Sequence, residues 1–311
     1  MNRRLWESRS LFLTGLADVW EGVKDRARSG GERSGLSLMV ASAAAFSLMA
    51  AMAKLLLPRT PTQAVVLSRG LLMTALCVAL AMRKRVSLIG KEPAKLLLRG
   101  LLGYGALSCY FYSVQHLPLG DAVLLQYSHP AFVAALAPLL LGERTDRAHW
   151  FMVLTALAGV ALIVGPSGDV RAGALVGLTG SILSGLAYMT VRDLSRTEHP
   201  LTILVWFPLA TIPGSLVATF LAGKAAAPRS VREVLGHLAV FTCALVGQIA
   251  LTEGLTRTGA ARATAVSMTG PVFGLVFGLV FFGTRPTLWS VAGMALVIGA
   301  LWRLAREGAR S

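Results

Sequence analysis

The sequence predicts an all-α integral membrane protein with ten transmembrane helices, arranged as two inverted five-helix repeats with both termini in the cytoplasm. The first observation is composition: 55% of the 311 residues are hydrophobic, 14% are charged and the mean hydropathy is +0.65, which is too apolar for a water-soluble fold. The second is the length of the apolar runs, which suits helices and lacks the period-two alternation of a transmembrane barrel. The third is a similarity between the two halves of the chain at a spacing of about 140 residues.

Ten apolar runs reach the length of about 20 residues that a helix needs to cross roughly 30 Å of hydrocarbon. The connections between them are short and carry turn residues, such as Pro58-Arg59-Thr60-Pro61, so no soluble domain fits between the helices. The expected helices lie near residues 35–57, 61–82, 96–117, 121–141, 149–165, 172–191, 200–222, 234–256, 260–283 and 287–304.

Residues 1–34 precede the first helix and are expected in the cytoplasm. Phe12, Leu16, Trp20 and Val23 recur at helical spacing with charged residues between them. This pattern predicts an amphipathic helix on the membrane surface, and a partly disordered tail is the alternative. The apolar stretch is too short and too interrupted for a signal peptide. Residues 306–311 are expected to form a second cytoplasmic tail.

The distribution of lysine and arginine predicts the orientation. With the N-terminus in the cytoplasm, 22 of the 30 Lys and Arg residues fall in inner segments and 6 in outer loops, while Lys54 and Arg69 lie within helices. This asymmetry explains the net charge of +15 without a nucleic-acid partner. The excess of Arg over Lys, 24 to 6, together with the Ala, Gly and Leu content indicates a GC-rich bacterial genome. We therefore expect the protein in the cytoplasmic membrane of a bacterium.

The chain repeats itself once. The segments that begin at Leu119 and Thr258 are related by an offset of 139 residues, and a pattern of Pro, Phe, Gly and Arg from Pro130 to Arg144 recurs from Pro271 to Arg285 at an offset of 141. We therefore divide the chain into repeats at residues 35–166 and 167–305. Because each repeat holds five helices, an odd number, the second enters the membrane from the opposite side. Transporters that work by alternating access use this arrangement.

Several stretches resemble one family of membrane proteins. A proline-aromatic-apolar helix ends in Gly142-Glu143-Arg144, is preceded by "HLPLGDA" and is followed by "ALAGVALIVGP". The tenth expected helix carries "ALVIGAL", and "PTQAVVLSRGLLMTA" supplies a second helix with an arginine, Arg69. These features resemble the drug/metabolite transporter superfamily of EamA type over roughly residues 35–304. The resemblance implies ten helices in two inverted repeats and the export or exchange of small organic solutes such as amino acids. The second copy has Thr284 where the first has Glu143.

Ionisable residues inside the membrane are costly, so each is a candidate functional residue. Arg69 lies eight residues after Pro61, about 12 Å along a helix. We expect it to bind an anionic substrate group or to gate the outer side; snorkelling or a hydrogen bond to the backbone is the alternative. His129 is a candidate for proton coupling, with a neutral, hydrogen-bonded histidine as the alternative.

Two other charged positions have simpler interpretations. Lys54 is near the outer end of the first helix, where we expect it to snorkel to the surface. Glu253 precedes Arg257 by four residues near the cytoplasmic boundary, which predicts an interfacial ion pair.

A mostly apolar pocket with a few polar groups is expected among the helices. Tyr104, Ser108, Phe111 and Gln115 follow i, i+4, i+7, i+11 spacing on one face of the third helix. Other helices contribute uncharged polar and aromatic candidates: Gln126, Tyr127, Tyr188, Trp206 and Gln248. For each of these the alternative is a packing role or a place at the membrane interface.

Prolines and glycines mark where helices bend and pack. The fourth expected helix carries "QYSHP" at residues 126–130, and the ninth carries "SMTGP" at residues 267–271. Pro130 removes a backbone donor and is expected to bend its helix around a cavity, with Pro271 in the inverted position. Small residues at every fourth position predict close helix packing: Gly173, Gly177, Ser181 and Gly185 in one helix, Gly270, Gly274 and Gly278 in another.

The sequence carries no signature of catalysis. It lacks HExxH, GxSxG and P-loop motifs, and Cys77, Cys109 and Cys243 share no metal-ligand spacing, so we expect no enzyme, no metal site and no cofactor. The predicted function is a secondary active transporter in the lipid bilayer that exports or exchanges a small organic metabolite, with a proton or counter-substrate as the coupling partner. The alternatives are an organic-anion exchanger and a non-transporting membrane sensor or scaffold that binds a metabolite.

Overall fold

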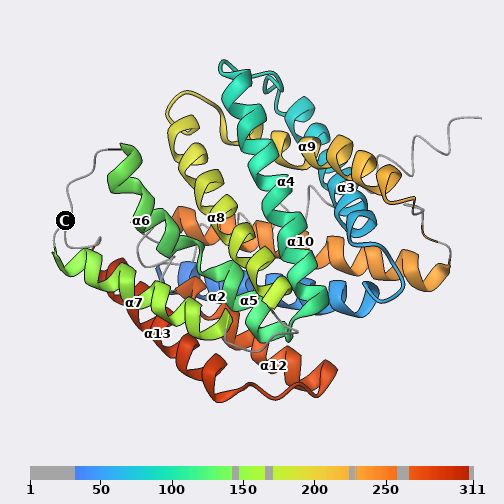
Figure 1. Ribbon diagram of the computed structural model, residues 1–311. Helices are drawn as coiled ribbons and strands as arrows, with labels where there is room; N and C mark the ends of the chain where they lie inside the picture. The colour runs from blue at the N-terminus through green and yellow to red at the C-terminus, as the bar shows by residue number, and fades with distance from the viewer. Residues whose placement is uncertain are drawn as a thin grey trace, which may run out of the picture.

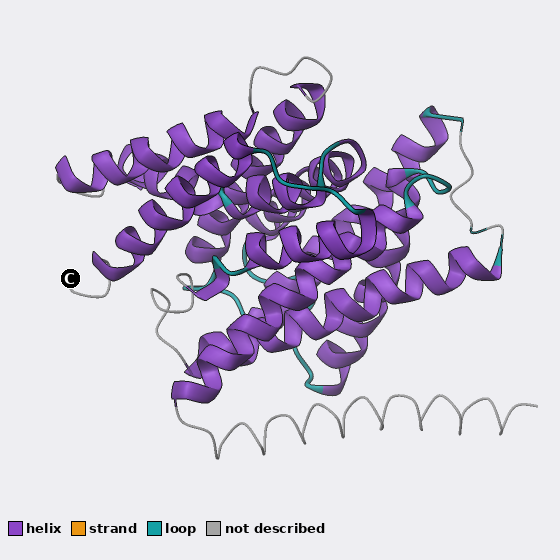
Figure 2. Cartoon of the chain, turned by 90° about the horizontal axis from the view of Figure 1, so that it is seen from below, coloured by secondary structure: helices purple, strands orange, loops and turns teal. Residues whose placement is uncertain are grey.

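The computed structural model describes residues 32–141, 147–164, 171–223, 228, 230–257 and 266–307. Within these ranges every regular element is an α-helix (Figure 2). The expected amphipathic helix before residue 32, and Glu143 and Arg144, lie outside the described residues. The helices are α2 (Glu32–Leu56), α3 (Thr62–Arg83), α4 (Pro93–His116), α5 (Leu119–Tyr127), α6 (His129–Leu141), α7 (Arg147–Val164), α8 (Arg171–Leu194), α9 (Pro200–Leu221), α10 (Val231–Arg257), α12 (Gly270–Phe282) and α13 (Leu288–Glu307).

Several helices have the length and the surface of membrane spans. Five described helices are long and apolar enough to cross a membrane: Ser34–Leu56, Thr62–Arg83, Ala172–Leu194, Pro200–Leu221 and Val231–Gly254. Shorter apolar helices cover Trp150–Leu162, Gly270–Phe282 and Leu288–Arg303. Large apolar side chains lie on the outside, including Phe220 at 84% and Leu288 at 88% exposed, a surface that lipid accommodates better than water. The described chain is all-helical, as predicted, and the ten spans stay a prediction.

Helices from the two halves of the chain pack against each other. α2 packs along α10, α4 along α8 and α3 along α9, while α5 contacts α12 and α7 contacts α13. Figure 1 shows α7 and α13 side by side at the lower left of the bundle. The largest cluster of buried apolar side chains joins residues of α2, α4 and α5, such as the fully buried Phe111 and Leu124, to residues of α8, α10 and α13, such as Ala174, Ala244 and Val297. The interior is therefore shared by both halves.

The fourth expected helix is broken where its polar residues meet Pro130. α5 ends at Tyr127 and α6 begins at His129. Because Pro130 has no N–H, the carbonyl of Gln126 four residues earlier loses its usual donor, and Nδ1 of His129 donates to it at 2.8 Å. The Ser128 hydroxyl donates to the carbonyl of Leu124 at 2.9 Å. The polar side chains of "QYSHP" thus satisfy backbone groups that the break exposes.

The ninth expected helix has a similar break. Residues 268 and 269 form a turn immediately before α12, whose second residue is Pro271. The Thr269 hydroxyl donates to the carbonyl of Val266 at 2.8 Å, much as Ser128 does in the fourth helix. Both segments therefore combine a proline with a hydroxyl that donates to a backbone carbonyl three or four residues earlier.

Glycines allow α12 to approach α5 closely. A Cβ on Gly270 would lie 2.6 Å from Cε2 of the Tyr127 ring, and one on Gly274 would lie 2.9 Å from Cβ of Val123. In α8, a Cβ on Gly177 would meet the side chain of Ser113 on α4 at 2.6 Å. Side chains of the neighbouring helices therefore pack directly against these glycines.

Lys54 does not extend to the outer surface as expected. Its ammonium group donates to the carbonyls of Val114 at 2.7 Å and Leu117 at 2.6 Å, and it lies 5.7 Å from the ring centroid of Phe282. The last carbonyls of a helix have no partner within the helix, and the negative end of the helix dipole favours a cation there. The end of α4 therefore attracts Lys54 inward and ties α2 to α4.

Gly270→Ala should lower the temperature of thermal unfolding, because its methyl group would overlap the Tyr127 ring and overpacking costs about 1–3 kcal/mol. The matched control is Gly299→Ala in α13, where a Cβ meets nothing within 4 Å and helix propensity favours alanine. Intrinsic fluorescence of the purified variants during heating measures both. Equal unfolding temperatures for the two variants would contradict the close packing of α12 on α5.

Candidate functional site

One buried arginine and one partly buried arginine lie against the same phenylalanine ring within the bundle. The guanidinium carbon of Arg69, on α3, is 5.6 Å from the ring centroid of Phe207, on α9, and that of Arg99, on α4, is 5.1 Å from it. Arg69 is only 7% exposed. The two guanidinium carbons can be no farther apart than the sum of these distances. Cation–π attraction holds both groups without neutralising either charge.

A short repeated motif brings the two arginines to this place. Arg69-Gly70 on α3 and Arg99-Gly100 on α4 are each followed by two leucines. A Cβ on Gly70 would lie 3.2 Å from Cβ of Thr211, and one on Gly100 would lie 2.7 Å from Cβ of Ala210. The glycines therefore let α9 pack closely on both helices, which places Phe207 against both arginines.

Neither arginine forms an ion pair within the part of the chain that the structure describes. The Nε atoms of Arg69 and Arg99 are buried there without a hydrogen-bond partner. The described ion pairs lie elsewhere: Lys95 with Glu92 and with Asp193, and Arg257 with Glu253. The last of these, at 3.2 Å, is the pair expected at the cytoplasmic end. The centre of the bundle thus carries two positive charges with no carboxylate beside them.

Tyrosines on three helices lie near the arginines or near one another. Tyr110, on α4, is near Arg69, Tyr188, on α8, is near Arg99, and Tyr127, on α5, is near both of these tyrosines. Tyr188 is 53% exposed. We call Arg69, Arg99, Tyr110, Tyr127 and Tyr188 the central polar cluster.

The "QYSHP" segment joins this cluster to α8. The ring of His129 stacks on that of Tyr188, with centroids 4.6 Å apart and planes 15° apart. The side-chain amide of Gln126 donates to the Ser184 hydroxyl at 3.0 Å. Since Nδ1 of His129 donates to a carbonyl, it carries a proton and leaves Nε2 as the remaining site for proton exchange. The structure thus brings Gln126, His129 and Tyr188 together with Ser184.

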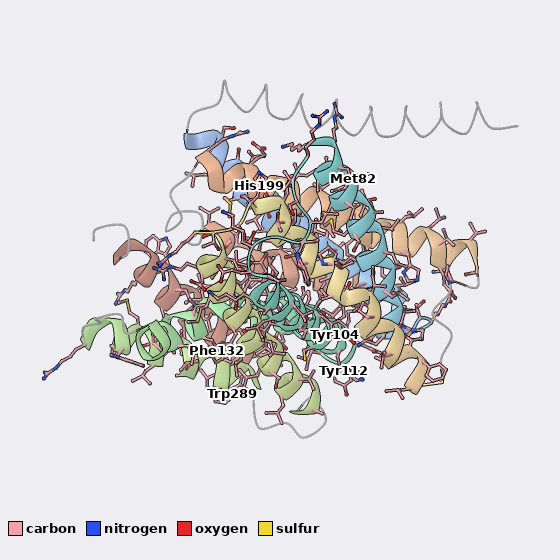
Figure 3. The ribbon with its side chains drawn as sticks, turned by 90° about the horizontal axis from the view of Figure 1, so that it is seen from above. Met82, Tyr104, Tyr112, Phe132, His199 and Trp289 are labelled. Atoms are coloured by element: carbon pink, nitrogen blue, oxygen red, sulfur yellow. The ribbon has the colours of Figure 1, made fainter. Side chains whose placement is uncertain are left out.

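A separate pocket opens at the predicted outer end of the bundle. Its volume is ≈ 840 Å³, and it is lined by residues 57–63, one face of α4, the end of α9 and Glu233 of α10. The α4 face comprises Ser108, Cys109, Tyr112, Gln115 and His116. Figure 3 shows Tyr112 and Trp289 toward this end and Met82 and His199 at the opposite, predicted inner end. We call this cavity the outer pocket.

Tyr104 lies one helical turn deeper than Ser108. Its hydroxyl donates to Oε1 of Gln63 at 3.3 Å, and its ring packs against Gly214 of α9, where a Cβ would be 2.5 Å from it. Gln115 also reaches α3, because its Oε1 accepts a hydrogen bond from Thr62 at 2.8 Å. Tyr104 and Gln63 therefore form a floor between the outer pocket and the arginines, and Ser108 and Gln115 line the pocket above it.

Three predicted site residues take other places. Phe111 is fully buried in the apolar core, so the face of α4 that lines the outer pocket carries Tyr112 instead. The indole N–H of Trp206 donates to the carbonyl of Leu88 at 2.9 Å, which anchors an inner loop rather than lining a cavity. Gln248 is on α10, which packs along α2, and among the described residues its side chain forms no hydrogen bond with the central polar cluster.

The predicted inner end is closed by hydrogen bonds between the α3–α4 loop and the α8–α9 connection. The Glu198 carboxylate, only 8% exposed, accepts the backbone N–H groups of Lys91 and, at 2.6 Å, of Glu92. The Thr197 hydroxyl donates to the Glu92 carboxylate at 2.6 Å. Lys95 pairs with Glu92 at 2.7 Å and with Asp193 at 2.8 Å. We call residues 87–95 and 193–206 the inner clasp.

The inner clasp depends on ionised carboxylates. Hydrogen bonds from Lys95 and then from Thr197 lower the pKa of the Glu92 carboxyl. A lowered pKa means that the closed clasp favours the carboxylate form. This contribution is present at neutral pH and is lost as the pH falls through the lowered pKa. Lys95 and Asp193 are exposed, so the ion pair between them is weak and water can replace it.

Known proteins resemble the chain over most of its length. The sequence model of the EamA-like transporter family matches residues 33–165 and again residues 171–305. The pseudopaline exporter CntI of Pseudomonas aeruginosa is 30% identical over 277 residues, which cover 88% of this chain and 96% of that protein. An uncharacterized transporter of Helicobacter pylori is 28% identical over 276 residues, covering 85% of this chain and 92% of that protein.

More distant similarities agree with these. Solute carrier family 35 member G1 of Mus musculus is 24% identical over 232 residues, which cover 69% of this chain and 63% of that protein. A solved crystal structure at 20% sequence identity covers 88% of this chain and 98% of its own, with a TM-score of 0.62. At this level of identity the match shows a shared fold alone.

Arg69→Gln should leave the unfolding temperature of the ligand-free protein unchanged or raise it. The guanidinium is buried without a carboxylate, and removing an uncompensated buried charge removes its desolvation cost. Heating monitored by intrinsic fluorescence tests this, with Gly270→Ala as the reference for structural damage. A decrease as large as that of Gly270→Ala would show that Arg69 is a structural residue.

Proposed function

Because the chain belongs to the EamA-like transporter family, we propose that it is a secondary transporter that exports or exchanges a small organic metabolite across the cytoplasmic membrane of a bacterium. Transport proceeds by alternating access between two inverted five-helix repeats. The observation that carries this proposal is the difference between the two ends of the bundle. The inner clasp is closed, and the outer pocket is open.

The packing of the helices supports two inverted repeats. If α2 of the first repeat corresponds to α8 of the second, and α4 to α10, then the packed pair α2–α10 is equivalent to the packed pair α8–α4. Three other packed pairs, α3–α9, α5–α12 and α7–α13, each consist of two helices that correspond to each other in the two repeats. The family matches at residues 33–165 and 171–305 divide the chain at the same place.

Corresponding positions at the two ends differ in the way that alternating access requires. Arg59 precedes Glu198 by 139 residues, the offset of the repeat. Glu198 binds the start of α4 and closes the inner end, whereas Arg59 faces the outer pocket, with Glu233 in the first turn of α10 among the other lining residues. In the opposite state of the cycle we expect the inner clasp to open and the outer residues to close.

The relatives support a metabolite as substrate and export as direction. One is named a pseudopaline exporter, and others are named transporters. A metabolite sensor that binds without moving its ligand is the rival. The outward-facing pocket favours a carrier, since a sensor needs access from one side only and no matched contacts at the other.

Flux through proteoliposomes tests the proposal directly. Purified protein reconstituted into vesicles should exchange at least one amino acid or related metabolite between the two sides, above the leak of protein-free vesicles. The panel consists of solutes that first shift the unfolding temperature of the purified protein. If several solutes bind but none of them crosses the membrane, the result would reject the transporter and favour the sensor.

A cross-link across the inner clasp should stop transport. In a background with Cys77, Cys109 and Cys243 replaced by alanine, Glu92→Cys and Thr197→Cys place thiols where the two side chains now touch. A short thiol-specific cross-linker should abolish flux, and a reductant should restore it, because the inner end can no longer open. The single variant Thr197→Cys, treated alike, is the control. Full flux through fully cross-linked protein would show that the clasp is not a gate.

A further inference from the structure

We propose that Arg69 and Arg99 together bind a substrate with two acidic groups, such as a dicarboxylate, one group to each guanidinium. This inference rests on the proposed function, because it names the substrate class of the same carrier. The sequence analysis predicted Arg69 alone; Arg99 adds a second cation to the site.

The first step is charge. A buried guanidinium without a counter-ion is expensive, and two of them close together repel each other as well. The acidic side chains that the structure describes do not compensate Arg69 or Arg99, and no ion pair in the described ranges involves either residue. Two anionic groups of a ligand would neutralise the site.

The second step is geometry. Both guanidiniums lie against the same ring of Phe207, at 5.6 and 5.1 Å from its centroid, so one small molecule can reach both. Each also has a buried Nε without a partner. A guanidinium offers a planar fork of donors that matches a carboxylate, and one carboxylate can occupy one fork. Two forks held by one ring therefore favour two acidic groups on a short carbon chain.

The third step is the surroundings. The hydroxyls of Tyr110, Tyr127 and Tyr188 lie within electrostatic reach of the arginines or of one another. A tyrosine hydroxyl can donate to an anion without adding a charge. The central polar cluster thus has donors for anions and two charges that repel cations, so a polyamine or another cationic solute does not fit it.

The binding test uses three probes with the same five-carbon chain: glutarate, valerate and cadaverine. Isothermal titration of the full-length purified protein should show glutarate binding at least about tenfold tighter than valerate, because the second carboxylate gains a second charge-assisted contact. Cadaverine should not bind. Equal affinity for glutarate and valerate, or binding of cadaverine, would overturn the proposal. Two valerates bound for each protein would show two separate monoacid sites instead.

The variants test the two arginines. Arg69→Gln and Arg99→Gln should each bring the affinity for glutarate down to that for valerate, and the double variant should bind neither. Arg99→Lys keeps the charge and loses the fork, so it should bind glutarate with intermediate affinity. Arg83→Gln, at the exposed end of α3, removes a charge from the same helix and should change nothing. Unaltered glutarate affinity in folded Arg99→Gln would exclude Arg99 from the site.

Flux separates this proposal from the proposed function. If glutarate binds through both arginines but does not cross the membrane of the proteoliposomes, the result supports the proposed diacid-binding site and contradicts the proposed transport function. If a neutral or cationic solute crosses and Arg99→Gln leaves its flux unchanged, the carrier stands and the acidic substrate class is overturned.

Discussion

In a chain that spans lipid, every buried polar group has to find a partner within the protein, and this constraint explains most of the polar contacts in the bundle. Lys54 satisfies the carbonyls at the end of α4, and His129 satisfies the carbonyl that Pro130 leaves without a donor. The Thr269 hydroxyl, before Pro271, donates to the carbonyl of Val266. Arg69 and Arg99 each keep a buried Nε without a partner within the described chain, as do several hydroxyls, such as those of Thr74 and Ser215. The two arginines carry charge as well, and they are where we expect the ligand to complete the structure.

The same packing that holds the arginines also separates the two ends of the bundle. α9 lies close to both α3 and α4 because Gly70 and Gly100 have no side chains, and Tyr104 fills the space outward of this contact. The ligand site is therefore below the floor of the outer pocket, while the inner clasp closes the other side. In the proposed transport cycle we expect α9 to move relative to α3 and α4 along the contacts of Gly70 and Gly100.

The sequence alone predicted the all-helical membrane class, because composition and run length depend on the solvent and not on tertiary contacts. It also predicted the pair of Glu253 and Arg257, which are neighbours along one helix. It placed Phe111 in the cavity because Phe111 shares one face of its helix with Tyr104, Ser108 and Gln115. In a helix that is apolar on all sides, the sequence does not show which face turns toward the cavity, because packing against the neighbouring helices decides this. The sequence analysis counted Arg99 among the Lys and Arg residues of the inner segments. A charged residue near a helix end gives the same sequence pattern whether its side chain faces water or the interior of the bundle. For Arg99, the recurrence of Arg-Gly-Leu-Leu was the available signal.

The central claim is that one end of the bundle opens as the other closes while ligand neutralises the buried arginines. Spin labels at Arg59→Cys and Glu233→Cys, two positions that line the outer pocket, in protein without other cysteines measure this most directly by pulsed electron resonance in vesicles. The account predicts two distances, a long one for the open pocket and a shorter one for the closed pocket, with populations that shift on addition of a substrate. A single distance that no substrate changes, in protein that transports, would contradict it.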